Sequence, residues 1–254
     1  MSYYKQIVID LDIPFKEGLT DDGSVYLKEM GWDSVQELKP EFDSLADKGL
    51  APRINFITRK DSLWAVMTPI KGPEVFDLYT SDPDKLYSTG FAQSLARLCL
   101  GLYEVKLWHD DLHGFNVLLE EETDRCVVVD LDSCCRRGRH QLPSYISEYV
   151  DLLLSAYIGG IGDGIRWLVT DLKFKDRIEK LATSDLVGQK ALINEQNKYI
   201  NNPSFQSQYT KEPIKSILIE RGRIDRVDPR IMDFLFRACH KRTRPKNFDG
   251  ILNI

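Results

Sequence analysis

The hydrophobic pattern of the chain changes from strand-like to helix-like near residues 71–73, and this change limits the folds open to it. Before this point, short apolar stretches that alternate with polar residues predict strands over 7–13, 24–30 and 54–70. After it, apolar residues recur every three or four positions over 91–105, which predicts an amphipathic helix. We therefore expect an α+β protein in which a small strand-rich unit precedes a larger helical one.

Several further elements follow from the same patterns. A helix is expected over 34–48, where Pro40 predicts a late start or a kink. Residues 54–70 are expected to form a hairpin that turns at Lys60-Asp61, and 71–73 are read as a linker. Two short strands around a polar turn are expected within 117–132, and later helices are expected over 146–158, 163–182, 185–200, 213–221 and 229–240.

The composition excludes some classes of partner. The 254 residues include 34 Lys and Arg against 39 Asp and Glu, and a net charge of −5 disfavours nucleic acid or an anionic membrane as the main partner. The basic stretch 221–246 has no aromatic stacking platform, so a nucleic-acid partner is not expected. No apolar run approaches the roughly 20 residues of a membrane span. Five cysteines without a C-x-x-C pair indicate a reducing compartment, so we expect a cytoplasmic protein.

The most informative segment is WHDDLHGFNVLL (108–119), which is followed by VVVDLDS (127–133). His109, Asp111 and Asn116 lie in a short polar loop, and Asp130 follows an apolar strand. Phosphoryl transfer from ATP needs a carboxylate that orients the acceptor hydroxyl, and oxygen ligands that hold Mg²⁺ against the phosphates. The residue types and their order fit this chemistry.

The pattern H-x-D-L-x-x-x-N, followed by a strand and an Asp, resembles the protein-kinase-like superfamily. The resemblance implies one bilobal domain over 1–254, with a β-rich lobe over 1–70 and a helical lobe over 71–254 that bind ATP and Mg²⁺ between them. It makes Asp111 the catalytic-loop base. The expected Mg²⁺ ligands are Asn116, Asp130 and, as an additional acid, Asp132.

The same resemblance extends to the nucleotide-binding side. It assigns Lys28, in the strand SVYLKEM, to the ATP phosphates, with Glu41 as its ion-pair partner and Glu37 as the alternative. WAVMTPIKG resembles the strand and hinge that bind adenine, with Met67 near the gatekeeper and Thr68 to Ile70 at the hinge. Gly18 and Gly23 bracket the loop that would cover the phosphates.

The sequence departs from the kinase pattern in three places. No G-x-G-x-x-G precedes Lys28, so the cover over the nucleotide is shortened or built differently. Asp110 replaces the Arg of H-R-D, and an Asp would repel a phosphorylated activation segment. That segment is short, from Asp130 to Asp151, where Asp151 resembles the Asp that anchors the catalytic loop. We therefore expect an enzyme that does not require activation-loop phosphorylation, similar to compact bacterial effector kinases, which would be delivered into a host cell.

The third departure concerns the acceptor. His113 stands where Ser/Thr kinases have a lysine, and D-L-H-x-x-N is similar to the loops of aminoglycoside and lipopolysaccharide kinases. Arg244-Pro245, in contrast, resembles the end of a protein-kinase domain. We expect a protein Ser or Thr as the acceptor, with a small-molecule or sugar hydroxyl as the alternative. A pseudokinase binding module and a kinase fold that transfers AMP remain open.

Two unrelated site types also remain. His109 and His113 would share a face if their segment were a helix, which would suggest a metal site, although Gly114 favours a loop. The D-x-D pairs at 10–12 and 130–132 resemble the first motif of haloacid-dehalogenase-type phosphatases. The second pair lacks the Thr expected two residues later, where Cys134 stands.

Overall fold

The computed structural model describes residues 16–30, 33–59, 61–136, 145–158, 226–238 and 245–254. These residues form a mixed α and β structure with small antiparallel sheets. The strand predicted over 7–13 and the helices predicted over 163–182, 185–200 and 213–221 lie outside the described residues.

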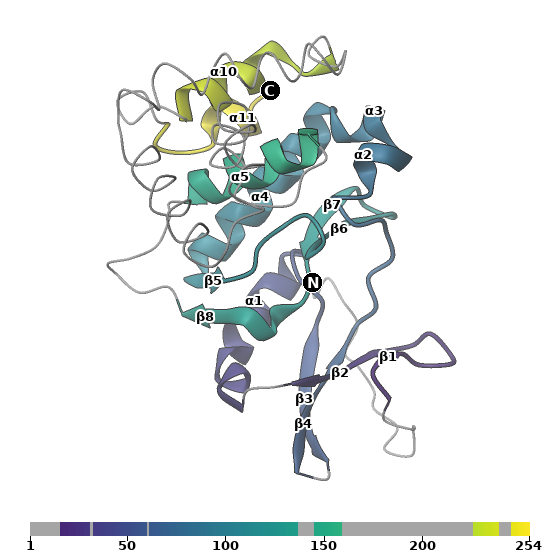
Figure 1. The fold of residues 1–254 in the computed structure, drawn as a ribbon. Helices are drawn as coiled ribbons and strands as arrows, with labels where there is room; N and C mark the ends of the chain where they lie inside the picture. The colour runs from purple at the N-terminus through teal and green to yellow at the C-terminus, as the bar shows by residue number, and fades with distance from the viewer. Residues whose placement is uncertain (1–15, 31–32, 60, 137–144, 159–225, 239–244) are drawn as a thin grey trace, which may run out of the picture.

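The largest sheet has four antiparallel strands in the order β1-β2-β4-β3. Its strands are β1 (Gly18–Leu19), β2 (Tyr26–Met30), β3 (Ile54–Arg59) and β4 (Ser62–Met67). The predicted hairpin over 54–70 is confirmed, and Asp61 at its turn has a φ of 65°. Figure 1 shows this sheet at one end of the molecule, away from the helices α4, α5 and α10.

The alternation along β2 places Lys28 on the face of the sheet that meets the main core. Lys28 pairs with Ala65 of β4, and both Ala65 and Met30 belong to that core. Leu27 and Val66 point to the opposite face, where they form a smaller cluster. Because Lys28 shares a face with buried apolar residues, its ammonium needs a counter-charge nearby.

The helix predicted over 34–48 starts as a 3-10 helix, η1 (Asp33–Leu38), and continues as α1 (Lys39–Asp47). Pro40 lies in the first turn of α1, where its missing N–H costs nothing, so the predicted late start is confirmed. Phe42 and Leu45 of α1 are fully buried.

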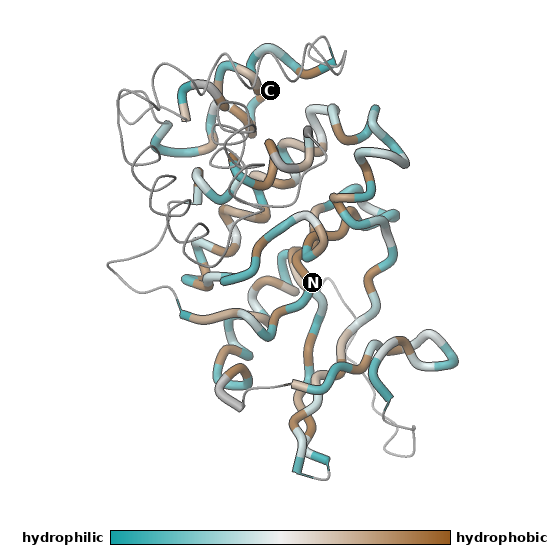
Figure 2. The backbone as a smooth tube through the Cα atoms, viewed as in Figure 1, coloured by the Kyte–Doolittle hydropathy of each residue, from teal (hydrophilic) through white to brown (hydrophobic). Residues whose placement is uncertain are grey.

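The helical part contains α2 (Leu78–Ser81), α3 (Pro83–Leu86), α4 (Thr89–Glu104), α5 (Tyr145–Ile158), α10 (Pro229–Ala238) and α11 (Asp249–Leu252). The hydroxyl of Ser88 caps α4 by accepting the N–H of Phe91 at 3.1 Å. Figure 2 shows hydrophobic residues gathered along α4 and α5, and α4 also packs against β7. Among the described residues, no helix has the length and apolarity needed to cross a membrane.

Residues 71–75, expected as a linker at 71–73, are bonded to β6 (Val117–Glu120) and form an isolated β-bridge between Glu74 and Leu118. They run beside the hairpin formed by β6 and β7 (Arg125–Val128). Three backbone hydrogen bonds of 2.8–2.9 Å join them to the β6 side, from Val75 to Val117, from Leu119 to Pro73 and from Glu121 to Lys71. The connection between the sheet and the helical part is therefore fixed to β6.

A third, two-stranded pairing was not predicted. β5 (Leu107–His109) pairs with β8 (Cys134–Arg136), and the short 3-10 helix η2 (Leu131–Ser133) precedes β8. This pairing brings the polar loop after β5 next to the turn after β7.

Candidate active site

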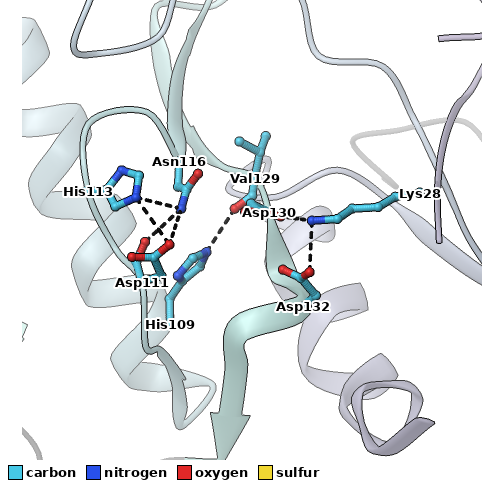
Figure 3. Close-up of polar contacts among 8 residues, drawn as sticks. All are labelled: Lys28, His109, Asp111, His113, Asn116, Val129, Asp130 and Asp132. Carbon is cyan, nitrogen blue, oxygen red and sulfur yellow. Dashed lines mark hydrogen bonds and ion pairs between the residues drawn. The ribbon is translucent and has the colours of Figure 1, made fainter. Parts of the chain in front are cut away.

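The polar loop between β5 and β6 is closed by Asn116. The side-chain amide of Asn116 donates to the backbone oxygen of Asp111 at 2.9 Å and lies 3.4 Å from the Asp111 carboxylate (Figure 3). The backbone N–H of Asn116 donates to the carbonyl of His113 at 2.9 Å. Asn116 is buried, whereas the side chain of Asp111 is 58% exposed. In this loop, the buried side-chain amide of Asn116 thus holds Asp111, whose carboxylate is exposed.

His109 joins this loop to the turn after β7. Its imidazole is buried, and Nε2 donates to the carbonyl of Val129, the residue before Asp130, at 3.0 Å. Burial lowers the pKa of His109 below its usual range, although the bond to Val129 opposes this shift. His109 therefore acts as a neutral structural residue at the base of the site.

Asp130 has an unusual backbone conformation that places it in the site. Its φ and ψ of 59° and 52° lie in the left-handed region, which Asp tolerates better than most residues. The preceding N–H of Val129 donates to the carbonyl of Asn116 at 2.9 Å, so this turn is tied to the end of the polar loop. The turn at Asp130 consequently lies beside Asn116.

The ammonium of Lys28 reaches across from β2 to this turn. It contacts the carboxylate of Asp130 and lies 3.0 Å from a carboxylate oxygen of Asp132 (Figure 3). Burial would lower the pKa of Lys28, but the hydrogen bonds and charges of Asp130 and Asp132 outweigh it and raise the pKa. For Asp130, burial would raise the pKa, but the contacts with Lys28 and Asp132 lower it overall. Lys28 and Asp130 are therefore charged together at neutral pH.

Carboxylate and amide oxygens at this place suit a hard cation such as Mg²⁺. One carboxylate oxygen of Asp130 and one of Asp132 contact the ammonium of Lys28. No hydrogen bond to the side-chain oxygen of Asn116 is found among the described residues. The residues thus fit the expected ligand set. The part of the chain that the structure describes contains no group of three or more His, Cys, Asp or Glu side chains placed to bind a metal. The two histidines contact different groups. His109 donates to the carbonyl of Val129, and His113 lies beside the carboxylate of Asp111.

The expected pair between Lys28 and Glu41 is not formed in this structure. Glu41 instead accepts a hydrogen bond from Nε of Arg136, in β8, at 2.9 Å. The guanidinium of Arg136 also donates to the backbone carbonyl of Glu37 at 3.0 Å. The pairing of β8 with β5 carries Arg136 to α1, whereas Lys28 binds the nearer carboxylates. The other carboxylate oxygen of Glu41 is buried and has no hydrogen-bond partner among the described residues.

The residues expected around adenine lie at the end of β4. Met67 is buried, and the backbone N–H of Thr68 donates to the carbonyl of Arg53 at 3.0 Å. In the part of the chain that the structure describes, the buried hydroxyl of Thr68 has no hydrogen-bond partner, and Ile70 is half-buried. A buried hydroxyl that lacks a partner is rare, which makes this end of β4 a candidate for ligand contact.

The remaining expected residues lie further out. Gly18 is in β1 and Gly23 is in the turn before β2, both with positive φ and open space around them. Asp110 is exposed, and Asp151 is half-buried in α5. Arg244, Asp10 and Asp12 lie outside the described residues.

His113 stands beside Asp111 in the loop. Its Nε2 lies 3.3 Å from the Asp111 carboxylate and 3.3 Å from the Asn116 amide nitrogen. Sequence reasoning singled out His113 as a departure from the kinase pattern and, with His109, as a possible metal ligand, but did not predict its contact with Asp111. It missed Arg136 altogether, because its partner Glu41 is 95 residues away and no local spacing signals the contact.

Comparison with known proteins gives no family for this chain. No family model matches the sequence, and no curated protein is significantly similar to it. The function therefore has to be argued from the site itself.

Proposed function

We propose that the protein is an ATP- and Mg²⁺-dependent phosphotransferase with a bilobal, protein-kinase-like fold. The observation that carries the proposal is the convergence of Lys28, the loop that holds Asp111 and Asn116, and the turn at Asp130. Lys28 and Asp130 are 102 residues apart, and they meet with the charge and ligand types that phosphoryl transfer requires.

Each residue has a role in this reaction. Asp111 is exposed enough to meet an acceptor, so its carboxylate would orient the hydroxyl and take its proton. The hydroxyl oxygen forms a bond to the γ-phosphorus as the bond from that phosphorus to the ADP oxygen breaks. Lys28 would bind the phosphates, and Asn116, Asp130 and Asp132 would hold Mg²⁺. When bound, Mg²⁺ neutralises charge on the phosphates.

The adenine would lie against the end of β4, near Met67, Thr68 and Ile70. The unpartnered hydroxyl of Thr68 supports this placement, because a bound ligand would satisfy it. Gly18 and Gly23 would contribute to the cover over the phosphates. Open space and positive φ at both glycines are consistent with a close approach by ligand.

The acceptor we propose is the hydroxyl of a protein Ser or Thr. A small-molecule or sugar hydroxyl is the second candidate, and it is favoured by one observation: His113 contacts Asp111 where a protein kinase has a lysine. The short segment after Asp130 supports an enzyme that works without phosphorylation of that segment. The odd number of cysteines supports a cytoplasmic site of action.

The proposal is tested by incubating the purified protein with Mg²⁺ and γ-³²P-ATP, with and without a cell lysate. Asp130→Ala removes the proposed Mg²⁺ ligand, and Asp233→Asn is a control that removes an exposed carboxylate paired with Arg237 on α10. Label on protein that is lost with Asp130→Ala but kept with Asp233→Asn is the expected result.

Other outcomes separate the alternatives. ATP turnover that responds to a small-molecule pool, without protein label, would move the acceptor to a small molecule. Label from α-³²P-ATP alone would indicate AMP transfer. Absence of turnover and of Mg²⁺-dependent ATP binding would contradict the proposal and leave a pseudokinase-like binding module.

A further inference from the structure

His113 makes three polar contacts that together define its protonation. Its Nδ1 accepts the backbone N–H of Phe115 at 3.3 Å. Its Nε2 lies 3.3 Å from Oδ2 of Asp111 and 3.3 Å from Nδ2 of Asn116. A nitrogen that accepts a hydrogen bond carries no hydrogen, so this contact places the ring hydrogen on Nε2.

This tautomer decides which neighbour Nε2 binds. A nitrogen that bears hydrogen cannot accept from the Asn116 amide, but it donates to the carboxylate of Asp111. The side-chain amide of Asn116 donates to the backbone oxygen of Asp111 at 2.9 Å and to Oδ2 of Asp111 at 3.4 Å. Both side chains thus approach the same oxygen of Asp111, as Figure 3 also shows.

The imidazole of His113 is itself held in place. Its ring meets the ring of Phe115 edge-on at 5.8 Å, and Phe115 packs on Phe76 at 4.3 Å. The backbone N–H of Phe76 donates to the carbonyl of Gly114 at 3.1 Å, which fixes the same loop from the other side. Because the ring cannot easily rotate, its Nε2–H is a directed donor.

We propose that His113 is a positioning residue that fixes the Asp111 carboxylate through Oδ2 and thereby leaves Oδ1 to meet the acceptor hydroxyl. No hydrogen bond to Oδ1 of Asp111 is found among the described residues, and the side chain is 58% exposed. The inference rests on the proposed function, since it assigns the orientation of the proposed base.

Three substitutions distinguish positioning from simple loop stability. His113→Gln keeps an N–H donor near the place of Nε2. His113→Asn keeps an acceptor near the place of Nδ1, for the N–H of Phe115, but has no donor that reaches Asp111. His113→Ala loses both. All three are compared with the wild type for transfer from γ-³²P-ATP, with thermal unfolding as the measure of folding.

The expected result is a loss in kcat with little change in KM for ATP. A hydrogen bond to a charged group contributes roughly a factor of 10–100, so His113→Ala and His113→Asn should lower kcat by about that much. His113→Gln should restore most of the rate. Equal rates for His113→Asn and the wild type, or a His113→Gln variant as slow as His113→Ala although folded, would overturn the inference.

A second measurement examines the ring directly. Long-range ¹H–¹⁵N correlation spectra of the wild-type protein report which nitrogen of each histidine carries hydrogen, and His113→Gln identifies the signal of His113. We expect hydrogen on Nε2, and hydrogen on Nδ1 would contradict the inference. If the wild type transfers no phosphate at all, the proposed function fails and the positioning role falls with it. If the wild type transfers phosphate and His113→Ala matches it, only the positioning role fails.

Discussion

The side chains of Lys28 and Asp130 form an ion pair across 102 residues of sequence. This pair joins the four-stranded sheet to the turn after β7, and Asp132 completes it from η2 at 3.0 Å. One cation therefore balances two carboxylates that would otherwise repel each other. Lys28 thus partly neutralises the negative charge of Asp130 and Asp132, the proposed Mg²⁺ ligands, when no metal is bound.

Replacing Lys28 with Met should lower stability slightly and increase the response to Mg²⁺. The pair is partly exposed, so the loss in the free energy of unfolding should be about 1 kcal/mol or less. With Lys28 gone, Asp130 and Asp132 are free for the cation, and Mg²⁺ alone should raise Tm more in the variant than in the wild type. Differential scanning fluorimetry measures both shifts, with Lys39→Met, which removes the surface pair with Asp43, as the control. Equal Mg²⁺ shifts in Lys28→Met and the wild type would contradict the ligand assignment.

Replacing Asp111 with Asn should separate catalysis from nucleotide binding. The substitution keeps the size of the side chain but removes the base, so transfer should fall by about 10²–10⁴-fold. Mg²⁺-dependent ATP affinity, measured by isothermal titration calorimetry, should stay near the wild-type value. A variant that transfers phosphate at the wild-type rate would show that Asp111 is not the base.

Glu41 and Arg136 should respond differently to substitution. One oxygen of Glu41 binds Arg136, and the other is buried with no partner among the residues that the structure describes, so it can accept from a second donor such as Lys28 in the nucleotide complex. Glu41→Gln should therefore lower the transfer rate, by about tenfold if it removes one charge-assisted hydrogen bond. Arg136→Ala should keep the wild-type rate, since Arg136 is largely exposed and its contact with Glu37 is only to the backbone carbonyl. A loss of rate with Arg136→Ala alone would show that the pair with Arg136 is the form needed for transfer.

Gly72 should be intolerant of any side chain. Its φ is 153°, and a Cβ there would lie 2.0 Å from the backbone oxygen of Leu119 in β6. Gly72→Ala should lower the free energy of unfolding by about 2 kcal/mol or more, because backbone strain and displacement of β6 add together. In the control Gly90→Ala, in α4, the nearest atom is 3.9 Å away and stability should be unchanged or slightly higher. Chemical denaturation measures both, and equal effects would contradict the packing of 71–75 on β6.

His109 should make stability depend on pH. Burial lowers the pKa of His109 in the folded protein. Below the usual value of 6.5, the unfolded chain therefore binds a proton at this histidine that the folded protein binds only at lower pH. The contribution of His109 is therefore constant above that value and is lost as the pH falls below it, towards the folded-state pKa. His109→Gln keeps a donor for the carbonyl of Val129 and removes the titration. Between pH 7 and pH 5, Tm should fall more steeply in the wild type than in this variant, and parallel curves would contradict the prediction.

Local periodicity was enough to predict the elements of the fold that depend on their own sequence. The helix expected over 91–105 is α4, and the hairpins within 54–70 and 117–132 are present with their turns at Asp61 and Asp124. Each of these elements buries an apolar face that can be read within a window of about a dozen residues.

The relations that build the site were harder to predict because they join distant segments. β5 and β8 have three residues each, too few for a readable alternation. Residues 71–75 contain Gly and Pro, which indicate a linker, and their hydrogen bonds to β6 depend on a segment more than 40 residues away. The placement of Glu41 beside Arg136 likewise depends on the β5–β8 pairing rather than on either local sequence.

The attachment of residues 71–75 to β6 has a consequence for the connection between the sheet and the helices. The backbone from Lys71 onward is bonded to β6, and Thr68 is bonded to Arg53 in the segment that leads into β3. Pro69 and Ile70 lie between these two anchored points. Proline holds its φ near −65°, so this short connection has few rotatable bonds. The position of Lys28 relative to the loop that carries Asp111 is therefore restricted by the backbone as well as by the ion pair with Asp130.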